Sequence, residues 1–489
     1  MPEKGAPPNV HPVQRRVLRV LGALSSPREV AEALSPADRS SLAAERGPVN
    51  MAVGAAMVFE SGRGLDYDAV VERLSTRLHL IPRYRQRLAS PVPGVAQPEW
   101  VDDQHFDLRW HVRHVALPPP GGDAELAAFV GTEFSRKLDR DRPLWELNVV
   151  EGLARRRVAL VPRMHHALVD GVGAIDVGTV LLDPTATPIE VPPPEGAWEP
   201  LPYDRGRHLA RLAATPFVRA QKIVLDTATR ALDTSPRRAA EDVRRATDLL
   251  AELARTRPQA PMTPLNEPIS PNRRYAVARA SLAELKAAGK GAGGTVNDAL
   301  LAVVAGMLRR YLEAAGGALD DPPVALVPVS VRREDEQGEL GNRISTVFVD
   351  LPVADPDPRA RLRRISETMR ALKASSAVQA GALLVGATGW APPLVSSVLV
   401  RAMGGVRAFN LVVSNIPGPQ QPFYLGGSRM LEVFPVVPLN PVNQRLSVGI
   451  LSYDGGVFFG LLADRELDPP LDVATNALEH ALEELRAER

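Results

Sequence analysis

A chain of 489 residues, of which 45% are hydrophobic and 24% charged, has the composition of a globular protein and is too long for a single hydrophobic core. Its 58 basic and 57 acidic side chains give a net charge of +1, which argues against nucleic acid as a partner. The absence of cysteine excludes disulfides, thiolate metal sites and a cysteine nucleophile.

The N-terminal region and the longest apolar stretch indicate whether the protein is secreted or inserted in a membrane. Arg15, Arg16 and Arg19 interrupt the first apolar residues, so no signal-peptide core is predicted. Residues 374–405 are broken by glycines and by Pro392-Pro393, whereas a spanning helix needs about 20 continuous apolar residues. We therefore expect a cytoplasmic protein whose chain does not cross a bilayer.

The first part of the chain alternates strand and helix patterns. Residues 51–60 form an apolar run typical of a buried strand, and helical spacing of apolar residues follows over 66–78 and again over 126–138. The apolar run 158–161 leads directly into His165 and His166, which predicts that the two histidines lie at a strand end. These elements indicate an α/β lobe.

The second part begins with a change of composition. Prolines cluster over 183–202 and favour an extended linker, and the arginine-rich segment 205–257 has helical patterning. Thr295 is a good N-cap for a helix with an apolar stripe that reaches Tyr311. Strands and a last helix are expected at 324–331, 344–351, 409–414, 446–451, 457–462 and 471–486.

These patterns divide the chain into four parts. We expect an N-terminal extension at 1–33, a first lobe at 34–183, a proline-rich linker with a helical connector at 184–264, and a second lobe at 265–489. The predicted fold class is α/β, with mixed sheets and flanking helices.

The chemistry is predicted to lie in His165-His166-Ala167-Leu168-Val169-Asp170-Gly171. Consecutive residues on a strand point to opposite sides, so one histidine faces a cavity and the other packs behind it. A neutral imidazole can take a proton from a hydroxyl that attacks a carbonyl. Two alternatives are a hydrogen-bonded core histidine and a metal site, but we find no convincing ligand spacing and expect no metal.

This segment resembles the His-His-x-x-x-Asp-Gly motif of the bacterial wax ester synthase/acyl-CoA:diacylglycerol acyltransferases. That family is related to chloramphenicol acetyltransferase and to the condensation domains of peptide synthetases. Further segments resemble the family's and follow its order from about residue 34 to 487: Leu34-Ser35-Pro36-Ala37-Asp38, Pro143-Leu144-Trp145, Thr295-Val296-Asn297-Asp298, Val327-Pro328-Val329-Ser330-Val331-Arg332, Leu340-Gly341-Asn342-Arg343 and Ser414-Asn415-Ile416-Pro417-Gly418-Pro419. Ile416 departs from the family's usual valine.

The resemblance implies a chloramphenicol acetyltransferase-like fold with two lobes around a central tunnel. Acyl-CoA enters from one side and a diacylglycerol or long-chain alcohol from the other, and they meet at His166, the general base. No acyl-enzyme and no cofactor is expected, because acyl-CoA is a substrate, and the chain has no Gly-x-Ser-x-Gly elbow. His165, Asp170 and Gly171 then support the loop.

The resemblance also implies supporting residues in both lobes. Asp170 is expected to pair with an arginine of the second lobe, and Arg332 is the candidate, against the alternative of a solvated strand-end charge. Asn297 and Asp298 are expected near the reaction centre, against simple helix capping. Trp145 is expected in the substrate site or as a packing residue.

The acceptor's solubility predicts contact with lipid. A diacylglycerol partitions into membranes, so residues 377–403 together with the basic residues around 205–222 are candidates for peripheral contact with the inner membrane face or lipid droplets. The alternative is a buried helix pair with a solvated basic face. Two other functions stay open: a non-catalytic lipid-binding relative, and a condensation-type enzyme that uses carrier-tethered acyl groups.

Overall fold

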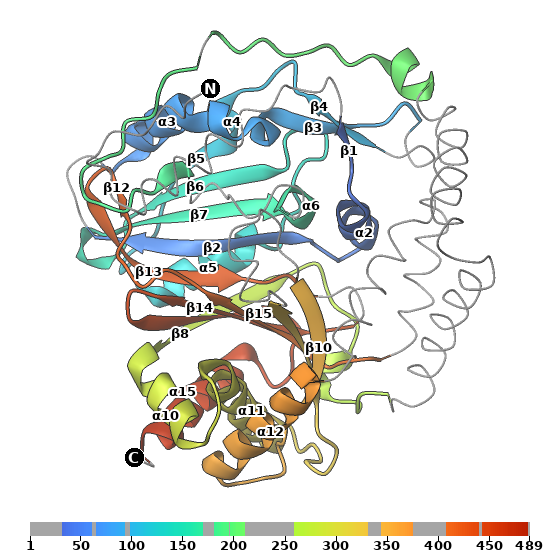
Figure 1. Ribbon diagram of the computed structural model, residues 1–489, viewed down its shortest axis with the longest axis vertical. Helices are drawn as coiled ribbons and strands as arrows, with labels where there is room; N and C mark the ends of the chain where they lie inside the picture. Colours follow the sequence, from blue (N-terminus) through green and yellow to red (C-terminus); the bar gives the residue numbers. More distant parts are fainter. Residues whose placement is uncertain are drawn as a thin grey trace, which may run out of the picture.

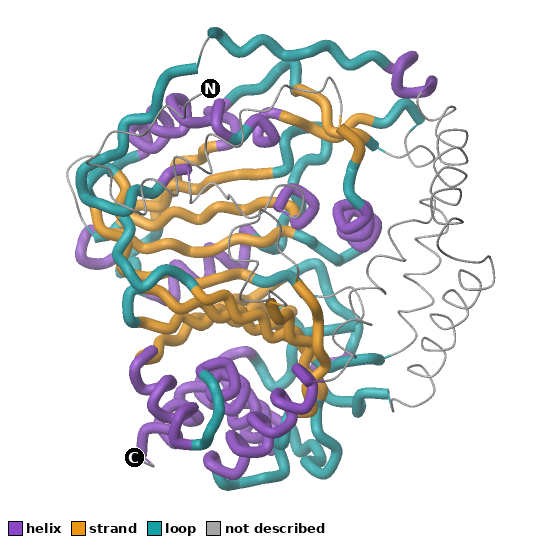
Figure 2. Tube along the Cα trace, viewed as in Figure 1, coloured by secondary structure: helices purple, strands orange, loops and turns teal. Residues whose placement is uncertain are grey.

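The computed structural model describes residues 32–60, 65–92, 98–169, 180–194, 196–210, 259–330, 344–374, 407–439 and 443–487. Predictions for the N-terminal extension, for most of the connector and for 375–406 therefore lie outside the described residues. Two six-stranded sheets form the two lobes. The first lobe lies above the second in Figures 1 and 2.

The first lobe is a mixed sheet with the strand order β12-β13-β2-β7-β6-β5. Its central strands are β2 (Ala52–Phe59), β7 (Val158–His165) and β6 (Trp145–Glu151), and β5 (Val112–Ala116) runs parallel to β6 at the edge. The helices are α2 (Pro36–Ala44), α3 (Tyr67–Arg77), α4 (Leu108–His111), α5 (Asp123–Glu133) and α6 (His166–Val169). A small sheet joins β1 (Glu32–Ala33), β4 (Glu99–Asp102) and β3 (Gln86–Ala89).

The second lobe has the strand order β10-β9-β11-β14-β15-β8. The strands are β8 (Arg273–Ser281), β9 (Val324–Ser330), β10 (Ile344–Asp350), β11 (Leu411–Pro417), β14 (Leu446–Tyr453) and β15 (Gly456–Asp464). The helices α10 (Leu282–Gly291), α11 (Val296–Ala314), α12 (Pro358–Ala374) and α15 (Leu471–Ala487) form a layer below this sheet in Figure 1. The strands predicted from 324 onward and the last helix are confirmed, whereas β8, α10, α12 and β13 were not predicted.

The two lobes are joined by β13, which follows strands of the second lobe in the chain but pairs in the sheet of the first lobe. The strands β12 (Tyr424–Leu425) and β13 (Ser428–Val436) come from the predicted second lobe, yet β13 pairs antiparallel with β2 of the first. β13 lies directly over Gly449 and Gly460, which face each other across β14 and β15. A Cβ at Gly460 would lie 2.0 Å from the Pro435 carbonyl oxygen, so glycine there permits the close approach.

The proline-rich linker is extended, as its composition predicts, but it packs along the first lobe. Asp183 forms an isolated bridge with Tyr424, and its buried carboxylate accepts hydrogen bonds from Arg73 and Arg77. Further along, the Trp198 ring meets Phe106 edge-on, and the Arg85 guanidinium lies 4.6 Å from the centre of the indole. The linker therefore covers the lobe that precedes it.

Among the described residues, no single helix is both long and apolar enough to cross a bilayer. Only α10 and α11 taken together have the required length and composition, and they meet at a bend of 95°.

Candidate active site

The two histidines lie where β7 ends and α6 begins. His165 is the last residue of the strand, and His166 is the first of the helix. The prediction of a strand end is confirmed, and the two side chains differ in burial: His165 is 1% exposed, whereas His166 is half-buried. The roles of the two histidines stay a prediction. The backbone on both sides is anchored, because His165 N–H donates to the Leu144 carbonyl and His166 N–H to the Met51 carbonyl, each at 2.9 Å.

The hydrogen bonds of His165 define its tautomer. Its Nδ1 accepts the N–H of Ala167 at 3.1 Å, so that nitrogen carries no proton. The proton of the neutral ring is therefore on Nε2, which lies 3.6 Å from Oε2 of Glu45. Nδ1 is engaged by the backbone, and Nε2 faces the Glu45 carboxylate beyond hydrogen-bonding distance on a ring that is 1% exposed. Burial therefore keeps His165 from a substrate.

Glu45 follows α2 and makes contacts that the sequence patterns did not reveal. Oε1 accepts the N–H of Met51 at 3.0 Å, and Oε2 accepts from Arg140 at 2.9 Å. Burial alone raises the pKa of Glu45, but its contacts with His165, the Met51 N–H and Arg140 outweigh burial and lower the pKa to about 2. Glu45 is therefore a buried carboxylate that stays ionised.

Trp145 lies within the first lobe's core, one strand away from the histidines. It is 1% exposed, and its indole N–H donates to the Tyr84 carbonyl at 2.7 Å. Its ring stacks on His111 at 4.6 Å, and Nδ1–H of His111 donates to the Trp145 carbonyl. The structure thus places Trp145 as a packing residue that supports β6 beside β7.

In the second lobe, two segments that the sequence treats separately come together. The side-chain amide of Asn415 on β11 donates to Oδ1 of Asn297 at 3.1 Å, and both residues are half-buried. Asp298 is 3% exposed and forms a capping box with Thr295 at the start of α11. Capping accounts for Asp298, whereas the Asn297–Asn415 pair keeps polar atoms at a partly accessible position.

The remaining predicted residues lie outside the described part of the chain. These are Asp170, Gly171 and Arg332. The predicted pairing of Asp170 with Arg332 therefore stays a prediction. Within the described ranges, no group of three or more acidic or histidine side chains could hold a metal ion.

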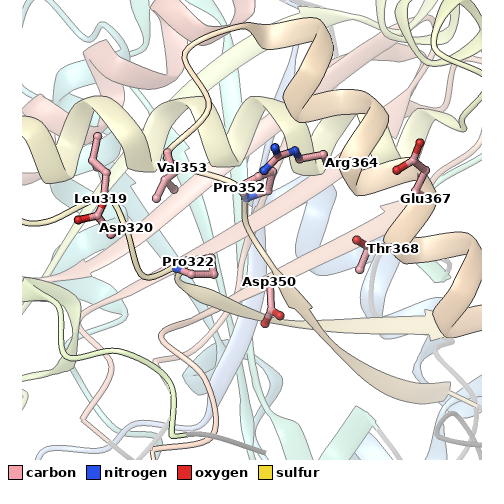
Figure 3. A pocket seen from close by; sticks show the side chains of 10 residues that line it. Leu319, Asp320, Pro322, Asp350, Pro352, Val353, Arg364, Glu367 and Thr368 are labelled. Carbon is pink, nitrogen blue, oxygen red and sulfur yellow. The ribbon is translucent and has the colours of Figure 1, made fainter.

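Two grooves in the described residues lie apart from His166. One, of about 300 Å³, lies in the second lobe between α12, the end of β10 and the loop before β9. Figure 3 shows its charged residues, among them Arg364 and Glu367 on α12 and Asp350 at the end of β10. The other, of about 520 Å³, lies between α5, β8 and α15. Neither includes a histidine, so the tunnel that the resemblance implies stays a prediction.

The two lobes of mixed sheet with flanking helices have a condensation-like α/β fold. The starter condensation domain of rhizomide synthetase shares this fold, with a TM-score of 0.56 at 16% identity over 94% of this chain and 95% of that domain. The solved wax ester synthase/diacylglycerol acyltransferase from Marinobacter aquaeolei matches with a TM-score of 0.65 and 29% identity, over 93% of this chain and 99% of that one.

The particular family follows from the sequence comparisons. The wax ester synthase/diacylglycerol acyltransferase catalytic domain matches residues 34–300, and the C-terminal domain of the same family matches 340–486. A probable diacylglycerol O-acyltransferase of Mycobacterium tuberculosis is 32% identical over 92% of this chain and 98% of its own length. The chain belongs to the wax ester synthase/diacylglycerol acyltransferase family.

Proposed function

We propose that the protein is an O-acyltransferase that moves a long-chain acyl group from acyl-CoA to diacylglycerol, and also accepts long-chain alcohols to make wax esters. Family membership and the names of the mycobacterial relatives support the reaction class. The observation that carries the assignment to one residue is the division between the two histidines. The His165 ring is buried, accepts the Ala167 N–H and faces the Glu45 carboxylate, whereas His166 is half-buried.

In the proposed reaction, the His166 imidazole takes the proton of the acceptor hydroxyl as its oxygen attacks the thioester carbonyl. The tetrahedral intermediate collapses with breakage of the carbon–sulfur bond, and the imidazolium returns its proton to the departing CoA thiolate. Ester and CoA are the products, and the base is regenerated. No covalent acyl-enzyme is needed, in agreement with a chain that has no cysteine.

The test is an assay with radiolabelled palmitoyl-CoA and with diacylglycerol and hexadecanol in competition. We expect both esters to form, and we expect His166→Ala to lower kcat by about 10²–10⁴-fold, the range for loss of a general base. The matched control is His480→Ala, a 61% exposed histidine on α15, which should keep the wild-type rate. Ester formation by His166→Ala at the wild-type rate would remove the proposed base.

The same assay separates the alternatives. A lipid-binding relative without turnover would bind acyl-CoA and form no ester. A condensation-type enzyme would form ester only when the acyl group is tethered to a carrier protein.

We also propose that the enzyme meets its acceptor at a lipid surface, at the cytoplasmic face of the membrane or on droplets. The poor water solubility of diacylglycerol supports this, as do Arg205 and Arg207, which are exposed residues of the linker. Flotation with anionic liposomes at low salt tests the proposal. Protein that stays at the bottom of the gradient would contradict it.

A further inference from the structure

We propose that Glu45 is a positioning residue for the base, acting through His165 and through the loop between Glu45 and Met51. The inference rests on the proposed function, because it concerns how His166 is held for that reaction. Neither the sequence motifs nor the family resemblance pointed to this residue.

The first line of support is a closed set of contacts around the histidine pair. Glu45 accepts the Met51 N–H, and the Met51 carbonyl accepts the N–H of His166 at 2.9 Å. On its other side, Oε2 of Glu45 faces Nε2 of His165. One carboxylate therefore contacts both the residue before the base and the loop that anchors the base's own backbone.

The second line is the tautomer of His165. Because its Nδ1 accepts from the first turn of α6, the ring must keep its proton on Nε2, where the Glu45 carboxylate stabilises it. The opposite tautomer would place a proton on Nδ1 against the Ala167 N–H. The charge of Glu45 thus favours the one ring state that is compatible with α6 beginning at His166.

The third line is how firmly Glu45 itself is held. Its side chain is 2% exposed, and Arg140 donates to both its carboxylate and the carbonyls of Leu42 and Glu45 at the end of α2. The same loop receives a contact from the second lobe, since Arg273 donates to the Pro48 carbonyl at 2.7 Å. α2 and α6 lie side by side at the ends of β2 and β7 (Figure 1).

Glu45→Gln keeps the size but presents an amide in place of the carboxylate. Its NH2 group would face either Met51 N–H or the donors on Arg140 and His165, so one donor–donor contact is unavoidable. The variant therefore weakens either the contact with His165 or the one that anchors Met51, without opening a cavity.

The experiment is steady-state acyl transfer by wild type, Glu45→Gln and Glu45→Asp, combined with thermal unfolding of each. We expect Glu45→Gln to lower kcat by about 10–100-fold with KM changed less than twofold, as for a misplaced catalytic group. Glu45→Asp, which keeps the charge, should recover most of kcat. The matched control is Glu484→Gln in the second lobe, which loses its ion pairs with Arg310 and Arg361 and should lose stability without losing kcat.

A double-mutant cycle with His165→Asn tests the route through His165. If Glu45 acts through that ring, Glu45→Gln should lower kcat much less in the His165→Asn background than in wild type. Fully additive losses would overturn the inference, and so would a folded Glu45→Gln enzyme with kcat within twofold of wild type. If Glu45→Gln does not fold, the comparison passes to Glu45→Asp, for which a folded enzyme with an about 10–100-fold loss of kcat is the overturning result, because that variant keeps the carboxylate charge. An inactive wild type would instead refute the proposed function.

Discussion

The surroundings of the histidine pair in the first lobe differ from those of α11 in the second. The first lobe buries charges: Arg163, 1% exposed, donates to Glu133 at 2.7 Å and to Glu146 at 3.2 Å, and Glu45 lies against His165. In the second lobe, α11 is buried along most of its length among aliphatic side chains of α10, α12 and α15, although this lobe also buries Arg273 against Asp464 and Arg361 against Glu484.

This difference matters for function because a base must be held in a defined orientation. Hydrogen bonds and buried ion pairs have directional geometry, whereas aliphatic packing resists volume change but specifies orientation less. The lobe that carries the histidine pair also buries His111, so we expect its stability to depend on pH below about 6.5. The following changes test that comparison, from the largest expected effect to the smallest.

Leu301→Ala in α11 should cost the most stability. Leu301 is 1% exposed, so its truncation leaves a cavity that lowers the free energy of unfolding by about 2–5 kcal/mol. The loss should be the same at pH 7.5 and pH 4.5, as measured by urea unfolding. Glu313→Ala on the exposed side of α11 is the control and should change the free energy by less than about 0.5 kcal/mol. A loss that differs strongly between the two pH values would contradict an aliphatic environment around Leu301.

His111→Phe should instead reveal the pH dependence of the first lobe. Burial lowers the pKa of His111 from its ordinary value of 6.5 to about 4, although the bond to the Trp145 carbonyl opposes the shift. The unfolded chain therefore binds this proton first, and stability falls as the pH drops from about 6.5 to about 4. At pH 4.5 the wild type should have lost about 2–3 kcal/mol through this group.

The phenylalanine variant keeps the ring between Phe106 and Trp145 but does not titrate. It should be less stable than wild type at pH 7.5 by about 1 kcal/mol, for the lost hydrogen bond, and should close or reverse that gap at pH 4.5. His480→Gln, at an exposed position, is the control and should leave the pH dependence unchanged. Parallel pH profiles for wild type and His111→Phe would show that His111 does not account for the acid sensitivity.

Arg279→Ala should have the smallest effect, although it joins the two lobes. The guanidinium on β8 pairs with Asp123 on α5 at 2.7 Å and with Glu432 on β13 at 2.5 Å. Because the side chain is 36% exposed, we expect a loss of about 0.5–1 kcal/mol that shrinks in high salt. Arg109→Ala, which breaks an exposed pair within the first lobe, should give no measurable change. A loss for Arg279→Ala that is independent of salt would indicate packing against Phe434 as its main contribution.

Local pattern was enough to predict much of the fold. The strand at 51–60 appears as β2 and the helix at 66–78 as α3, because apolar periodicity and the Asp66 cap act within a few residues. The amphipathic helix α12 was not predicted, although its apolar residues Leu362, Ile365 and Met369 have helical spacing. β13 could not be recognised as a first-lobe strand, because its partner β2 lies more than 350 residues earlier.

In the candidate site, too, local sequence predicts some features and misses others. The strand end at His165 and the cap at Thr295 follow from neighbouring residues, and both were predicted. The approach of Glu45 to His165 and of Asn415 to Asn297 joins residues more than 110 positions apart, and no local signal marks either pair.

The sequence by itself determined the reaction class. The histidine motif consists of consecutive residues, and the other family segments follow it in a recognisable order along the chain. Only the tertiary structure decided which side chains orient the histidines. Hydrogen bonds and charges act over a few ångströms in space, and chain folding alone brings Glu45, Arg140 and His165 within that range.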